Sequence, residues 1–258
     1  MRVALLATAL VLLGSLPALA QDEEPSLSFF YPLITRRPVI EREIELRTVH
    51  LKNDDGRETT TAAALEWPLL RAWQVEIEMP LVIRDPREGA TETGAGDLEI
   101  DNKVLLFSSI QHKFALGAGL ELRLPTGSEL RGLGGEAAAE PYVTAGIALG
   151  DFDVLASAAY EVNLNAHLHE PREHELSAGV ATGFRFRRWL TPLVELTTVT
   201  RTRGDNGDGL RGRTQVYVTP GFNTRPLPGT TLRFGVELPV TRAREFDYAV
   251  HAGLVWEF

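Results

Sequence analysis

Apolar and polar residues alternate with a period of two along most of the chain after residue 38. The last eleven residues show the pattern most clearly, because every second position from Tyr248 to Phe258 is apolar or aromatic. A period of two is typical of a β-strand, in which successive side chains point to opposite faces of the sheet. The pattern predicts twelve strands, at residues 39–51, 58–67, 72–83, 96–108, 112–124, 140–149, 152–164, 174–186, 189–202, 212–222, 230–240 and 245–258.

The length of these strands favours a membrane barrel. A strand of about eleven residues, rising ~3.3 Å per residue and tilted by about 40°, covers roughly 28 Å, whereas the apolar band of an outer-membrane barrel is ~25 Å tall. Tight turns, such as Gly150-Asp151, also alternate with longer polar loops, such as 85–95 and 125–136. The final strand alone would also suit a soluble β-sandwich. Together, lengths and connections predict an all-β fold, a transmembrane antiparallel up-and-down β-barrel of about 12 strands.

The positions of the aromatic residues support the barrel. In an up-and-down order, eleven of them fall near the strand ends on the same side as the carboxyl terminus. Aromatic rings collect at the boundary between membrane and water, whereas a soluble core gives no reason for such sorting. The predicted membrane girdle consists of Trp67, Trp73, Phe107, Phe114, Phe152, Phe184, Phe186, Trp189, Phe222, Trp256 and Phe258.

The first residues predict export. Arg2 precedes an apolar run from Val3 to Leu13, and Ala18-Leu19-Ala20 provides a cleavage site with small residues, as in a secretory signal. A membrane helix needs about 20 apolar residues, and this run is shorter. The chain therefore divides into a signal peptide (1–20), an N-terminal lead-in or small plug (21–38) and a barrel (39–258). The predicted location is the outer membrane of a Gram-negative bacterium.

Composition excludes several kinds of chemistry. The chain has no cysteine, so disulfides, thiolate metal sites and cysteine nucleophiles are excluded, and its net charge of −9 argues against a nucleic-acid partner. We interpret His167, His169 and His174 as parts of a solvated loop rather than a metal site. The sequence places no Ser and His together as a catalytic pair. We expect no enzymatic activity, no cofactor and no metal.

Charged residues occupy the predicted inner face of the barrel, with an excess of carboxylates. A pore lined in this way would favour cations or neutral polar solutes. Alternatively, opposed side chains pair and fill the interior, so that nothing passes; both alternatives stay open. The candidate lumen residues are Glu43, Glu45, Glu76, Glu78, Asp97, Glu99, Asp101, Lys103, Glu121, Arg123, Arg185, Arg213, Arg233 and Glu237.

The segment before the first strand, residues 25–34, is short and rich in aromatic residues. It could enter the lumen as a plug. The simpler interpretation, which we favour here, is a periplasmic lead-in whose aromatic rings dock on the rim of the barrel.

Two motifs carry a family resemblance. Gly94-Ala95-Gly96-Asp97-Leu98 opens the fourth predicted strand, and Leu122-Arg123-Leu124-Pro125-Thr126-Gly127-Ser128 ends the fifth. With the Phe-terminated last strand, they resemble the outer-membrane, transporter-like family named for the MetA pathway of phenol degradation, although Val104 stands where an aromatic residue is expected. Pro125 and Gly127 also have a plain architectural role, because they end strand pairing and begin a loop.

The resemblance implies an outer-membrane channel or transporter, with aromatic or other small hydrophobic compounds among its solutes. We therefore expect a channel for small solutes with a polar, acid-rich lumen; the alternative is a closed structural or surface-interaction barrel without conductance. The expected partners are outer-membrane lipid and lipopolysaccharide, a small-molecule solute, and the barrel-assembly machinery, through the strand that ends at Phe258.

Overall fold

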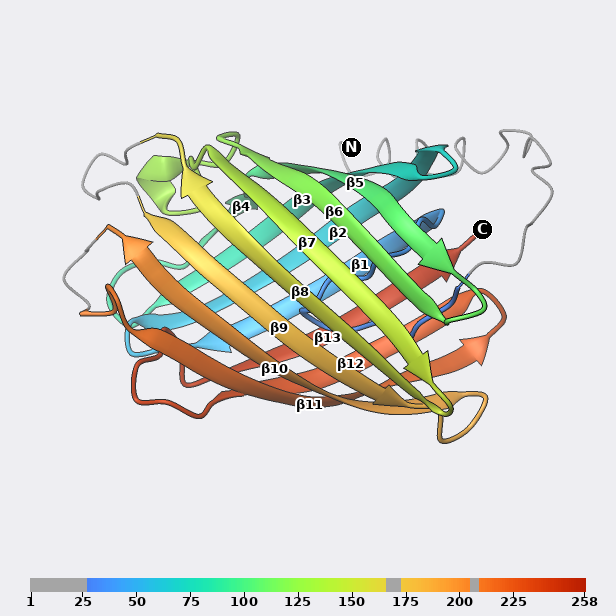
Figure 1. Ribbon diagram of the computed structural model, residues 1–258. Helices are drawn as coiled ribbons and strands as arrows, with labels where there is room; N and C mark the ends of the chain where they lie inside the picture. Colours follow the sequence, from blue (N-terminus) through green and yellow to red (C-terminus); the bar gives the residue numbers. More distant parts are fainter. Residues whose placement is uncertain (1–26, 166–172, 205–208) are drawn as a thin grey trace.

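A computed structural model describes residues 27–165, 173–204 and 209–258, and in it a single antiparallel sheet closes into a barrel (Figure 1). The predicted signal peptide, His167 and His169 lie outside the described residues. The elements are β1 (Glu43–Lys52), β2 (Gly56–Leu70), β3 (Trp73–Pro86), β4 (Glu92–Ala95), β5 (Leu98–Ser109), β6 (Phe114–Leu124), a 3₁₀ turn η1 (Glu129–Arg131), β7 (Ala138–Leu149), β8 (Phe152–Asn163), β9 (His174–Phe184), β10 (Leu190–Arg203), β11 (Thr214–Leu227), β12 (Thr230–Pro239) and β13 (Tyr248–Glu257).

Neighbours in sequence are neighbours in the wall, and β1 pairs with β13 in an unbroken register from Glu43↔Glu257 to Lys52↔Tyr248. The sheet then closes through β2 and β3. The short β4 pairs only with β3 and continues the line of β5 across residues 96–97. The wall is therefore a closed ring of twelve strands, as predicted. Closure leaves no sheet edge and satisfies the backbone polar groups between strands, as a bilayer requires.

Several strand ends differ from the predicted ones by a few residues, and three of the differences have local reasons. β1 begins at Glu43 rather than at residue 39, because the preceding residues are still crossing from the interior, where the amide of Glu41 donates to Gln74 at 2.8 Å. β11 runs on to Leu227 because a tight turn with Gly229 at φ 66° joins it to β12. β5 begins at Leu98 rather than at residue 96, and residues 92–95, predicted as loop, form the separate short strand β4 because they pair with the end of β3.

Burial is reversed relative to a soluble protein. Glu43 and Glu195 are 0% exposed, whereas Leu196 and Trp256 on the outer face are each 50% exposed. Soluble proteins bury apolar residues and expose charges. An apolar outer face with a polar interior is the arrangement of a barrel surrounded by lipid.

Within the described residues, no helix is long and apolar enough to cross a membrane.

The two ends of the barrel differ. Tight turns join β2 to β3, β5 to β6, β7 to β8, β9 to β10 and β11 to β12 at the end that also holds the carboxyl terminus, which we call the turn end (Figure 1). The longer connections, including 125–137 between β6 and β7, lie at the opposite, loop end.

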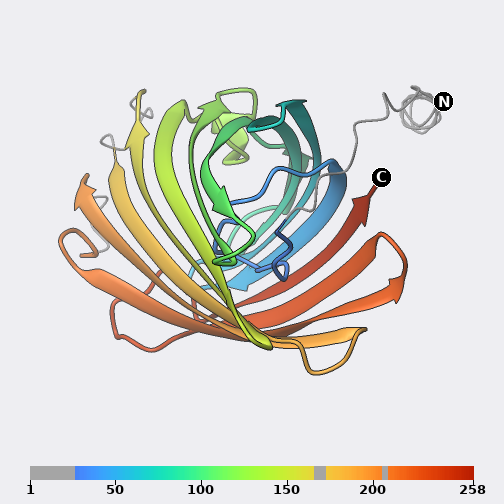
Figure 2. The same ribbon diagram turned by 45° about the vertical axis from the view of Figure 1, so that its right-hand side comes forward.

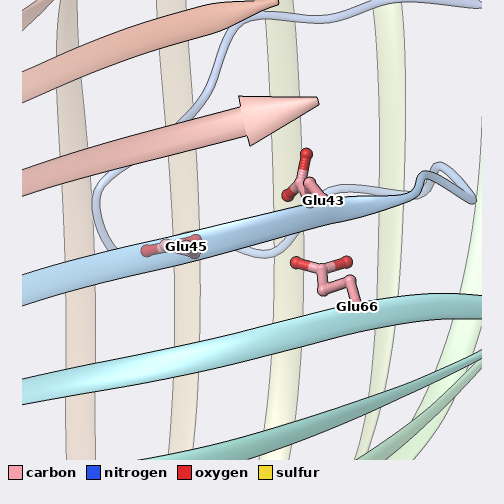
Figure 3. Close-up of side chains that lie close together, drawn as sticks. All are labelled: Glu43, Glu45 and Glu66. Atoms are coloured by element: carbon pink, nitrogen blue, oxygen red, sulfur yellow. The ribbon is translucent and has the colours of Figure 1, made fainter. Parts of the chain in front are cut away.

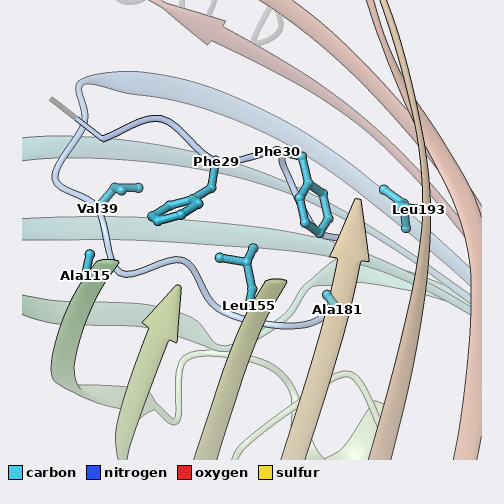
Figure 4. Close-up of a cluster of buried hydrophobic side chains, with 7 residues drawn as sticks. All are labelled: Phe29, Phe30, Val39, Ala115, Leu155, Ala181 and Leu193. Atoms are coloured by element: carbon cyan, nitrogen blue, oxygen red, sulfur yellow. The ribbon is translucent and has the colours of Figure 1, made fainter. Parts of the chain in front are cut away.

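Residues 27–42, which we call the lumen segment, lie inside the ring of strands (Figure 2). Phe29 and Phe30 are 2% and 5% exposed and pack against inward-facing Leu155, Ala181 and Leu193 (Figure 4). Burial of these rings brings a small apolar core into an otherwise polar interior. The aromatic residues of this segment are thus within the barrel and not on its rim.

Candidate functional site

The interior of the barrel holds a cavity of about 320 Å³ that is lined by charged side chains of the wall and by residues 31–37 of the lumen segment. Nine carboxylates and six cationic side chains line it. Ten of the predicted lumen residues are among them: Glu43, Glu45, Glu76, Glu78, Glu99, Asp101, Lys103, Glu121, Arg123 and Arg233. The alternation within β1, β3, β5, β6 and β12 places them on one face, because every second residue of a strand points inward.

Arg36 of the lumen segment occupies the middle of this charged region. Its guanidinium lies 2.6 Å from Glu140 and 2.7 Å from Glu121, and stacks 4.2 Å from the centre of the Tyr142 ring. A third carboxylate, Asp101, lies 3.7 Å from the guanidinium and accepts a hydrogen bond from the Tyr142 hydroxyl. A guanidinium stays protonated in proteins, and the carboxylates around Arg36 compensate its charge. Arg36 is therefore a permanent cation that ties the segment to β5, β6 and β7.

Glu43, Glu45 and Glu66 form a second cluster, near the turn end (Figure 3). Their oxygens lie within 4.8 Å of one another, a spacing that a metal ion could use. Each carboxylate, however, contacts a cation of its own: Arg37 is 3.0 Å from Glu43, Lys103 is 3.4 Å from Glu66, and Arg233 contacts Glu45. The cluster is thus built as an ion-pair network, because buried charges require such partners.

The backbone of the lumen segment is also bound by the wall. Glu195 of β10 accepts the N–H groups of Leu33, Ile34 and Thr35 on one carboxylate. On the neighbouring strand β11, the Asn223 side chain donates to the carbonyl of Tyr31 at 2.7 Å. The Tyr31 hydroxyl reaches Glu43 at 2.7 Å and Glu257 at 2.6 Å. An irregular backbone can be buried only where its polar groups find partners, and here strands from around the barrel supply them.

Inward-facing glycines make room for the apolar side chains of the lumen segment. A Cβ on Gly183 would lie 2.5 Å from the Phe30 ring, and one on Gly146 would lie 3.0 Å from the Phe29 ring. A Cβ on Gly235 would lie 2.2 Å from Leu33. Any larger residue at these positions would collide with the segment. Wall and segment are therefore complementary in shape as well as in charge.

The remaining candidate lumen residues lie elsewhere. Asp97 lies at the loop end, where its carboxylate accepts the amides of Gly127, Gly135 and Glu136 at 2.8–2.9 Å and so holds the loop between β6 and β7. Glu237 does face inward, and contacts His251 at 2.9 Å.

Two arginines are displaced from the predicted positions. Arg185 follows β9 at the turn end and contacts Asp153. Arg213, assigned to the lumen by its parity, is exposed in the connection before β11, because that strand begins only at Thr214. Strand alternation has no meaning beyond the end of the strand, so the assignment of Arg213 is corrected.

The predicted girdle residues gather towards the turn end, and most are exposed on the outer face. Phe186 and Trp189 differ, because they border a pocket at the mouth of the barrel. Ring pairs with centroids 4.8–6.1 Å apart connect neighbouring strands at Phe107–Phe114, Phe152–Phe184 and Phe222–Phe234. The ring of Phe258 lies 5.4 Å from that of Trp256 at the same strand end and 6.2 Å from that of Trp67 on β2.

Sequence reasoning missed the cations of the lumen segment. Arg36 and Arg37 stand outside every periodic stretch, so alternation could not assign them to the lumen. The available signal was indirect. Glycines recur on the inward face of the predicted strands, including Gly146, Gly183 and Gly235, and such glycines leave room for another segment inside the barrel.

A closed barrel with an apolar outer face and a charged interior defines the class of this protein: it is a channel-like barrel of the outer-membrane type. The chain belongs to the family described as "Putative MetA-pathway of phenol degradation", whose model matches residues 46–248. The resemblance inferred from the two sequence motifs is thereby confirmed.

Solved structures with the same fold include channels and porins. The COG4313 outer-membrane channel from Pseudomonas putida F1 is 12% identical, with a TM-score of 0.67 over 90% of this chain and 100% of that one. The NanC porin is 9% identical, with a TM-score of 0.60 over 83% of this chain and 100% of that one. The KdgM porin is 11% identical, with a TM-score of 0.55 over 84% and 99%. No curated protein sequence matches the chain.

Proposed function

We propose that this protein is a gated channel in the outer membrane of a Gram-negative bacterium, and that the lumen segment is its plug. The observation that carries the proposal is the set of contacts that hold the segment across the interior. Glu195, Glu121 and Glu43 bind it from β10, β6 and β1. The turn end then faces the periplasm, and the loop end faces lipopolysaccharide.

The charges of the lumen favour cations and neutral polar solutes once the plug has moved. Arg36 and Arg37 would leave with the segment, so the nine carboxylates of the cavity would face only the four cations of the wall, Arg47, Lys103, Arg123 and Arg233. An excess of carboxylates repels anions from a pore. The family's name adds small aromatic compounds such as phenols as candidate solutes; uncharged ones would not be repelled.

A reversible crosslink tests the plug. The Cβ of Thr35 lies 3.8 Å from the Cβ position of residue 179, which matches the Cβ–Cβ separation of a disulfide. The chain contains no cysteine, so Thr35→Cys/Gly179→Cys introduces one defined pair. In planar bilayers, the oxidised protein should be silent, and a reductant should restore discrete, cation-selective steps. Each single variant should be indifferent to the redox state.

Deletion of residues 28–36 provides the complementary measurement, because a barrel without its plug should conduct continuously and with larger steps. If the oxidised double variant conducts as well as the reduced one, solutes do not need the plug to move. A barrel that stays silent when reduced and when the segment is deleted would instead be the closed, structural barrel, for which the dense ion pairing of the interior would also be suitable.

A further inference from the structure

The mouth of the barrel at the turn end contains a pocket of about 680 Å³, separate from the charged cavity of the lumen. The turn between β9 and β10 and the end of β11 form its walls, and Phe29 and Phe30 of the lumen segment form its floor. Asp153, Thr191 and Asn223 contribute from the inward face of β8, β10 and β11. The amide of Arg225 donates to the carbonyl of Trp189 at 3.0 Å, which fixes the two walls to each other.

This pocket is strongly cationic, in contrast to the acid-rich cavity further inside the barrel. Four arginines line it, Arg185, Arg187, Arg188 and Arg225, together with a single carboxylate, Asp153. Arg185 forms an ion pair with that carboxylate, so Asp153 does not compensate the other three arginines. Among the described residues, Arg187, Arg188 and Arg225 have no carboxylate partner. Three uncompensated guanidinium groups at one pocket are an unusual concentration of positive charge.

Aromatic groups complete the pocket. Phe29 and Phe30 are buried in its floor, and Phe186 and Trp189 stand exposed at its edge. Arg187 lies 5.1 Å from the centre of the Phe186 ring, a distance at which a guanidinium interacts with an aromatic face. Arginine is well suited to bind carboxylates, because its planar fork of N–H donors matches the two oxygens, and aromatic rings accept an apolar body by stacking.

We infer that the pocket at the turn end is a carboxylate-binding site, which takes a carboxylate attached to an aromatic or other apolar body. The site opens to the turn end, so its ligand does not have to cross the acidic lumen. The inference does not depend on the plug opening; it needs only that the lumen segment forms the floor.

Two sources could supply the carboxylate. One is a free organic acid in the surrounding solution. The other is the chain itself, since Asp22, Glu23 and Glu24 precede Ser28, a residue of the pocket, by only four to six positions. At up to ~3.6 Å per residue, such a tether has a reach of roughly 14–22 Å. Both sources present the same chemical group to the same arginines, and the experiment can separate them.

The test uses the refolded mature protein in nanodiscs of zwitterionic phosphatidylcholine, which contain no anionic lipid to compete. Binding of 4-fluorobenzoate is measured by ¹⁹F NMR, with the neutral 4-fluorobenzamide as the matched probe. The acid should bind, and the amide should not. Arg188→Gln/Arg225→Gln should weaken binding of the acid roughly tenfold or more, because both guanidinium groups are lost. Heat-modifiable migration verifies folding of every variant.

A matched control removes the same amount of charge elsewhere. Arg87 and Arg211 are exposed at the loop end, so Arg87→Gln/Arg211→Gln should leave binding unchanged. In Asp22→Asn/Glu23→Gln/Glu24→Gln, tighter binding of the acid would show that the chain's own carboxylates occupy the site, and unchanged binding would assign the site to free acids alone. The inference is overturned if acid and amide bind equally in both wild type and this triple variant, or if the control pair weakens binding as much as the pocket pair.

Discussion

Glu195 of β10 is the wall residue whose loss should weaken docking of the lumen segment most directly. Its carboxylate accepts the N–H groups of Leu33, Ile34 and Thr35, with oxygen 2.8 Å from the nitrogen of Thr35 and 3.2 Å from that of Ile34. Each hydrogen bond to a charged group contributes about 1.5–3 kcal/mol. Water that enters the space beside an alanine recovers part of this, so Glu195→Ala should weaken docking by about 3 kcal/mol.

A change of about 3 kcal/mol multiplies the ratio of undocked to docked protein by roughly 100. If the undocked state conducts, planar-bilayer recordings should show a large rise in open probability with little change in step size. Glu175→Ala is the control, because it also removes a lumen carboxylate, but one that binds Arg201 at 3.4 Å. An unchanged open probability in Glu195→Ala, or an equal rise in the control, would refute the anchoring role.

Three further changes test other parts of the structure. Gly183→Leu should expel Phe30, since even a Cβ would lie 2.5 Å from its ring, and should increase proteolysis of the lumen segment; wild-type protection would contradict this. Asp97→Ala should release the loop that it holds through three backbone amides, giving roughly tenfold faster hydrogen exchange there; unchanged exchange would argue against this anchor. Deletion of Phe258, whose ring lies 6.2 Å from Trp67, should lower the yield of heat-modifiable barrel in cells; an undiminished yield would count against its role in assembly.

The wall could be predicted from the sequence because strand alternation is a local property. The alternation within each strand shows which of its residues face lipid. Twelve strands and most of the inward-facing charges can therefore be predicted from the period alone. The prediction fails where the strand ends: Arg213 has the right parity but lies in a connection, and residues 39–42, predicted as part of the first strand, precede its start at Glu43.

The position of the lumen segment could not be predicted in the same way, because its contacts are distant in sequence. Arg36 pairs with Glu140, 104 positions away, and Tyr31 is bound by Asn223, 192 positions away. No periodic pattern within residues 27–42 predicts that these distant residues are partners of the segment. The aromatic residues there suit a membrane rim as well as a buried core, and only the closed geometry of the barrel distinguishes the two.

The excess of carboxylates in the wall can act in two ways: it can bind the cations of the lumen segment, or it can attract cations from solution, but the same carboxylates cannot do both at once. While the lumen segment is docked, Glu121 and Glu140 hold Arg36, and Glu43 holds Arg37, so these carboxylates are compensated. In the proposed open state, the same carboxylates would be uncompensated and would attract cations. The charges from which the sequence predicts a cation-selective pore would therefore also form the binding surface of the proposed plug. The free energy of docking would come in part from the cost of leaving buried carboxylates without partners.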